Sequence, residues 1–140
     1  MSLHIQVLQM HNGVRVNRRK PIQFQDLRLG VHICEDAWWG ETTTFYDDPG
    51  TPQPDPISQL ASSGVDLFIN LSASPFELNK PGRRLEIATR HVTAHDRPLL
   101  FVNQVGGNDD LVFGGASFAL WPDGTVRAHG ATFAEDLVVV

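Results

Sequence analysis

Short apolar runs alternate with helical segments across the middle of the chain, and this order constrains the fold more than any other feature. Residues 27–33 alternate in the manner of a strand, and residues 65–72 and 98–105 are mostly apolar runs suited to buried strands. Helical patterns over 56–63 and 83–96 separate the three runs. The order strand–helix–strand–helix–strand predicts an α/β fold with a parallel sheet.

Turn and cap residues support these boundaries. Asp55 before Pro56 predicts the N-terminus of the first helix, and Gly64 predicts its end. Residues 116–129, with Pro-Asp-Gly at their centre, predict a hairpin that extends the sheet with antiparallel strands. Residues 137–140 are four apolar residues, which predict a last strand.

Composition and charge exclude several classes of partner. The 140 residues carry a net charge of −5 and no long basic block, which disfavours nucleic acid and anionic membranes as partners. No apolar run approaches the length of a membrane span or forms a signal core, so neither is expected. Cys34 is the single cysteine, which excludes an internal disulfide and fits a cytoplasmic protein.

Polar or reactive residues follow all three predicted parallel strands. Because ligands bind at the carboxyl ends of such strands, these residues are the candidates for a site. They are Cys34, Glu35 and Asp36 after the first strand, Asn70, Ser72 and Ser74 after the second, and Asn103 and Gln104 after the third.

Each of these candidates also has a purely structural interpretation. A lone cysteine is commonly a small buried apolar residue, Glu35 and Asp36 can cap a following helix, and Asn70 can satisfy backbone groups at a strand end. Position favours a reactive Cys34, since a helix N-terminus directly after a strand lowers a thiol pKa and offers amide donors to an oxyanion.

Three other patterns in the sequence are weaker candidates for a site. His91 and His95 are spaced to share one face of a helix, but the sequence shows no third ligand, so no metal site is expected. A Cys34–His95 pair would resemble a cysteine hydrolase dyad, yet nothing in the sequence places these residues together. The glycine pairs 106–107 and 114–115 match no nucleotide-binding pattern and are interpreted as turn residues.

Three segments in order resemble a known family. Residues 29–39 (LGVHICEDAWW) resemble the strand and nucleophile elbow of the nitrilase superfamily. Residues 69–76 (INLSASPF), followed by Lys80, and residues 102–113 (VNQVGGNDDLVF) resemble its glutamine-dependent NAD synthetase branch. The resemblance implies the C-terminal part of a four-layer αββα sandwich over residues 22–140, preceded by a poorly patterned segment, 1–21.

The resemblance also implies a chemistry and a set of site residues. Cys34 would be the catalytic nucleophile that attacks the side-chain amide of glutamine, and the backbone amide after it would stabilise the oxyanion. Ser74 and Lys80 fall on positions that hold the substrate glutamine in this family, and Glu35 is the third expected substrate-binding residue. The ammonia released would serve ATP-dependent NAD synthesis from deamido-NAD.

The sequence departs from the family pattern in three places. The family uses a glutamate and a lysine upstream of its cysteine, but no glutamate precedes Cys34 and the only upstream lysine, Lys20, lies in a segment that does not match. Gly114 stands where relatives commonly carry aspartate. The chain alone is therefore expected to have little or no activity.

The remaining expectations concern the parent enzyme. The segment itself is expected to need no cofactor, whereas ATP, magnesium and deamido-NAD would bind a separate synthetase domain. The expected partners of the segment are that synthetase domain, the substrate glutamine and further copies of the same chain. The alternatives are another nitrilase-family amide or nitrile hydrolase, or a non-catalytic interaction module with Cys34 buried.

Overall fold

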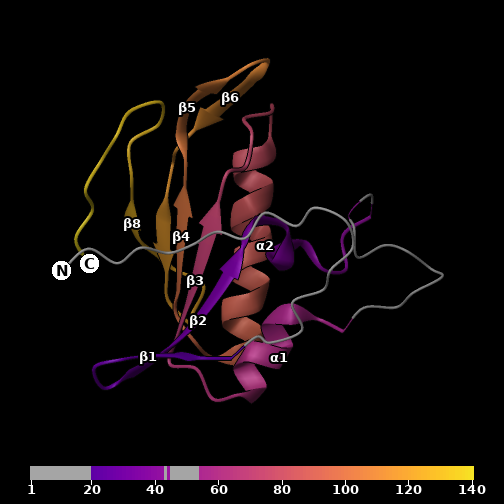
Figure 1. Cartoon of the computed structure of the whole chain (residues 1–140), viewed down its shortest axis with the longest axis vertical. Coiled ribbons are helices and arrows are strands. Elements are labelled where there is room, and N and C mark those ends of the chain that lie inside the picture. The colour runs from indigo at the N-terminus through magenta and orange to yellow at the C-terminus, as the bar shows by residue number, and fades with distance from the viewer. Residues whose placement is uncertain (1–19, 43, 45–53) are drawn as a thin grey trace.

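The computed structural model describes residues 20–42, 44 and 54–140, and its centre is a six-stranded sheet (Figure 1). The strand order is β1-β2-β3-β4-β7-β8, and β5 and β6 form a separate hairpin. The strands are β1 (Ile22–Phe24), β2 (Leu27–Ile33), β3 (Leu67–Ser72), β4 (Leu99–Asn103), β5 (Val105–Asn108), β6 (Leu111–Gly114), β7 (Phe118–Leu120) and β8 (Val126–His129).

The three central strands are parallel, as the order of elements predicts. β2 pairs with β3 and β3 pairs with β4 in parallel register, so that His32 lies opposite Asn70 and Asn70 opposite Phe101. The helix α1 (Pro56–Ser62) lies between β2 and β3 in the chain, and α2 (Lys80–His95) lies between β3 and β4. The carboxyl ends of β2, β3 and β4 therefore meet at one edge of the sheet, near the N-terminus of α2 (Figure 1).

The two helices pack on one face of the sheet and form the core with it. Ile57 and Leu60 of α1 and Val92 of α2 are fully buried against Phe68 of β3 and its neighbours. Gly30 in β2 permits this close packing, because a Cβ there would lie 3.0 Å from both the Phe68 ring and Val65.

The start of the first helix forms as its sequence signals predict. The Asp55 side chain accepts a hydrogen bond from the backbone N–H of Ile57 at 2.9 Å, and Pro56 occupies the first turn. Gly64 follows the helix with a positive φ of 77°, which a glycine adopts without strain. In the described ranges, the longest helix has 16 residues and none is long and apolar enough to cross a membrane.

Three elements differ from the sequence predictions. α2 begins at Lys80 rather than near residue 83, because Pro81 lies in its first turn, where a proline fits a helix, instead of in a loop. The glycines 106, 107 and 114 lie in the β5–β6 hairpin rather than in turns, and the turn is made by Asp109 and Asp110. The last strand predicted over residues 137–140 is wrong: these residues form no strand, and Leu137 and Val139 are almost fully exposed.

Candidate active site at the strand ends

Cys34 occupies a strained junction between β2 and a 3₁₀ turn, η1 (Cys34–Trp38). Its φ is +33°, a backbone conformation that side-chain-bearing residues rarely adopt. The thiol is half-buried, and the strand before it lies between β1 and β3 in the sheet. Such strain persists where the surrounding structure imposes it, and it is concentrated at functional sites.

Two hydrogen bonds, one local and one from the neighbouring strand, hold this junction. The Asp36 carboxylate accepts from the backbone N–H of Ile33 at 3.0 Å, so Asp36 does act as a cap. The Asn70 side chain, at the end of β3, donates to the Cys34 carbonyl at 3.4 Å. Glu35 is exposed directly beside the thiol-bearing residue. The turn that carries Cys34 is therefore fixed by the neighbouring strand as well as by its own residues.

Ser74, the second candidate, lies in a loop that a buried arginine fixes. Arg84 Nε donates to Ser74 Oγ at 3.1 Å, and its terminal nitrogen donates to the carbonyls of Ser74 and Pro75 at 2.8 and 2.9 Å. Ser74 and Arg84 are both nearly inaccessible to solvent. Burial lowers the pKa of Arg84, while interactions with Cys34 and Glu77 raise it. Arg84 therefore fixes the Ser74 loop, and it also lines a recess together with Ala37 and Trp38 of η1.

Asn103 fixes the same loop from the end of β4. Its side-chain oxygen accepts from the backbone N–H of Ser74 at 3.0 Å, and its amide nitrogen donates to the Gly115 carbonyl at 2.9 Å. The last residue of β4 thus meets the loop after β3, as the strand-end argument predicts. A small recess between η1, α2 and the sheet is lined by residues that include Trp38, Asn70 and Arg84.

Lys80 is the first residue of α2 and forms an ion pair with Glu77. A hydrogen bond from Lys80, together with its charge, lowers the pKa of the exposed Glu77 carboxyl. The Lys80 side chain is 21% exposed, so its ammonium group is partly open to a further anionic partner. Lys20, the upstream lysine, is exposed at the start of the described residues.

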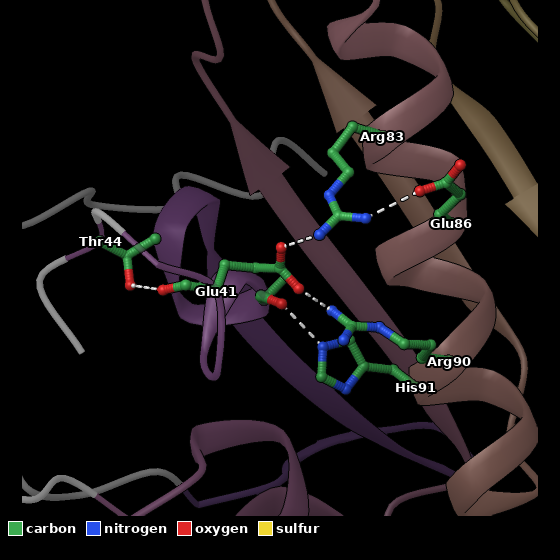
Figure 2. Close-up of polar contacts among 7 residues, drawn as sticks. Glu41, Thr44, Arg83, Glu86, Arg90 and His91 are labelled. Carbon is green, nitrogen blue, oxygen red and sulfur yellow. Dashed lines mark hydrogen bonds and ion pairs between the residues drawn. The ribbon is translucent and has the colours of Figure 1, made fainter. Parts of the chain in front are cut away.

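Glu41 contacts two arginines on α2 and was not identified from the sequence. Figure 2 shows its carboxylate between the guanidinium groups of Arg83 and Arg90, one pairing with each oxygen. The Glu41 side chain is only 10% exposed. His91, one residue further along α2, lies with Nε2 2.7 Å from the Ala37 carbonyl of η1 (Figure 2). These contacts hold η1 and the residues after it against α2.

Replacing Glu41 with glutamine should therefore destabilise the fold in a pH-dependent way. Burial raises the Glu41 pKa, but hydrogen bonds from Arg83 and Arg90 and their charges outweigh it, so the pKa lies below the ordinary 4.5. A carboxyl with a lowered folded pKa stabilises the protein above the unfolded pKa and loses this contribution as the pH falls through the folded pKa. The expected loss at neutral pH is about 1 kcal/mol, because both arginines are half-exposed.

Urea unfolding of Glu41→Gln and the parent chain at pH 7 and below pH 4 measures this difference. Glu86→Gln is the matched control, since Glu86 pairs with Arg83 but is 67% exposed, and it should change stability far less. Equal losses for the two variants, or a loss at Glu41 that does not shrink in acid, would contradict the assignment.

Asp55 lies next to His91 and His95 and could act with them as a third metal ligand, which the sequence did not show. One donor atom each from Asp55, His91 and His95 lies within 4.8 Å of the other two. Asp55 is 36 residues before His91 in the chain (91 − 55), so only the packing of α1 against α2 brings them together. The reasoning from sequence identified Asp55 as a helix cap and missed this proximity.

Comparison with known proteins gives the family. The sequence model of the carbon-nitrogen hydrolase family matches residues 5–140. The chain belongs to the carbon-nitrogen hydrolase family. This match begins inside the segment 1–21, whose first 19 residues lie outside the described part of the structure.

Curated relatives of this carbon-nitrogen hydrolase domain are glutamine-dependent NAD(+) synthetases. The protein from Synechocystis sp. is 38% identical over 84% of this chain, and that from Rhodobacter capsulatus is 35% identical over 86%. The chain spans only about a fifth of their length, 20% and 19% respectively.

Solved structures confirm the α/β nitrilase-like fold. The glutamine-dependent NAD+ synthetase of Acinetobacter baumannii superimposes with a TM-score of 0.72 at 28% identity, covering 88% of this chain and 21% of that one. A carbon-nitrogen hydrolase from Helicobacter pylori gives a TM-score of 0.69 at 22% identity over 85% of this chain and 41% of that one, which supports the fold.

Proposed function

We propose that this domain hydrolyses the side-chain amide of glutamine and supplies the ammonia for NAD synthesis in a longer enzyme. The observation that carries the proposal is Cys34 itself, a half-buried thiol at a strained strand–turn junction. Relatives at 38% and 35% identity are glutamine-dependent NAD(+) synthetases, which makes glutamine the favoured amide over other amides or nitriles.

The proposed chemistry is nucleophilic catalysis through a thioester. The Cys34 thiolate attacks the amide carbon, and the carbon–nitrogen bond breaks as nitrogen takes up a proton and leaves as ammonia. Water then attacks the thioester, releasing glutamate and restoring the thiol. The backbone N–H of Glu35, directly after the nucleophile, would donate to the oxyanion in both steps.

Substrate recognition is assigned to Glu35, Ser74 and Lys80. The Lys80 ammonium suits the α-carboxylate of glutamine, and the exposed Glu35 carboxylate beside Cys34 suits its α-ammonium group. Ser74 Oγ accepts from Arg84, so its O–H can still act as a donor to a substrate oxygen, although the side chain is buried in this structure. Arg84 is a positioning residue in this proposal, because it fixes the Ser74 loop.

The longer enzyme is proposed to divide the work between domains. This domain would need no cofactor, whereas ATP, magnesium and deamido-NAD would act in a synthetase domain, and the enzyme would work in the cytoplasm. The chain is also proposed to associate with further copies of itself.

A chloroketone analogue of L-glutamine tests recognition, since the thiolate displaces chloride and forms a stable thioether only after the analogue binds. Lys80→Met should slow the labelling of Cys34 roughly 10–100-fold, the effect of losing a charge-assisted contact of about 1.5–3 kcal/mol. Lys20→Met, which removes an exposed lysine of the same charge, should leave the rate unchanged. Equal rates for the two variants would contradict the assignment of Lys80.

A further inference from the structure

The cluster of Asp55, His91 and His95 joins the two helices at a point that the proposed hydrolysis does not use. Asp55 is the N-cap of α1, and the two histidines lie one turn apart near the end of α2. Their imidazole rings are nearly parallel, 8° apart, with centroids separated by 6.5 Å. Two imidazoles and one carboxylate are ligands that a divalent transition-metal ion prefers.

The hydrogen bond of His91 leaves one ring nitrogen suited to a metal. A carbonyl can only accept, so the 2.7 Å contact with Ala37 places the hydrogen of His91 on Nε2 and leaves the lone pair on Nδ1. Metal-binding histidines typically donate their other N–H to a carbonyl in this way.

The other two donors keep capacity for an ion. Asp55 accepts from the Ile57 backbone with one oxygen and from Ser58 with the other, and each carboxylate oxygen has a second lone pair. His95 Nε2 lies 3.4 Å from Ser58 Oγ, which places its ring beside the Asp55 carboxylate.

We propose that Asp55, His91 and His95 bind one Zn²⁺ ion, with water as the fourth ligand. Zinc bonds of about 2.0–2.1 Å require donor atoms roughly 3.4 Å apart, so small side-chain rotations would bring the three donors from their separation of up to 4.8 Å into position. The ion would join α1 to α2 and, through His91 and Ala37, to the turn that carries Cys34. Its role is structural and separate from amide hydrolysis.

Calorimetric titration of the untagged, metal-free chain with zinc chloride tests the site. One ion should bind per chain, and zinc should raise the melting temperature. Asp55→Asn is the most informative variant, because asparagine is as good an N-cap as aspartate but a poor metal ligand. Asp55→Asn and His95→Ala should each weaken zinc binding about 10–100-fold or more, since even outer-shell changes cost that much.

Two controls separate this site from adventitious binding. His129→Ala removes an exposed histidine of β8 and should not change zinc affinity. The double variant His4→Gln and His11→Gln should also retain binding. No stoichiometric binding, binding that survives both Asp55→Asn and His95→Ala, or binding lost only in the double variant would overturn the proposal.

Discussion

Glutamine hydrolysis by the 140-residue chain is expected to be at least about 10⁴-fold slower than hydrolysis by a family member that carries the upstream glutamate and lysine. General acid–base help contributes roughly 10²–10⁴ and one oxyanion donor roughly 10²–10³ to the rate. No glutamate precedes Cys34 in this sequence, and the only preceding lysine, Lys20, is exposed. The nucleophile and its following amide remain, so binding should survive better than turnover.

Ammonia release from glutamine measures this rate, with Cys34→Ala as the background control. The parent chain and Cys34→Ala are expected to differ little. Turnover that depends on Cys34 and approaches that of an intact relative would refute the argument from the missing residues. Another base would then have to be found, with His32, two residues before Cys34, the first candidate.

Replacing Phe68 with alanine is expected to cost about 3–5 kcal/mol of unfolding free energy, the usual loss for a large buried aromatic side chain. Phe68, the second residue of β3, is fully buried. Its ring centroid lies 6.2 Å from that of His32 and 6.0 Å from that of His95, both in edge-to-face arrangements, and its ring fills the space above Gly30. The cavity would lie between the sheet and both helices, where no neighbour can close it without moving a helix.

Denaturant unfolding at equilibrium gives the change in free energy from the midpoint and slope. Phe24→Ala is the matched control, because Phe24 in β1 is 50% exposed, and it should cost less than about 1 kcal/mol. Similar losses for the two phenylalanines would show that Phe68 is not at the centre of the core.

The central part of the fold could be predicted because its signals are local. Alternation over residues 27–33, the Asp55–Pro56 cap and the Pro-Asp-Gly turn each describe a short stretch of chain, and all three form as predicted. The start of α2 was misplaced because Pro81 fits both a loop and a first helical turn. The apolar residues 137–140 show that apolar character alone does not make a strand without a partner to pair with.

The candidate site was predictable only where strand order determines proximity. Cys34 and Ser74 follow neighbouring parallel strands, and Asn103 at the end of β4 hydrogen-bonds to the Ser74 backbone. Arg84, Glu41 and the approach of Asp55 to His91 were missed, because each depends on how α2 packs against distant segments. No spacing in the sequence records such packing.

The most direct test is to identify the residue that a glutamine-like electrophile modifies. Cys34 is the only cysteine, so a chloroketone analogue of L-glutamine should add a single group, found by peptide mass spectrometry on Cys34. The L-analogue should react about 10–100-fold faster than its D-enantiomer, because recognition through charged contacts depends on configuration. Labelling at another residue, or equal rates for the two enantiomers, would contradict the claim that Cys34 is the nucleophile of a glutamine site.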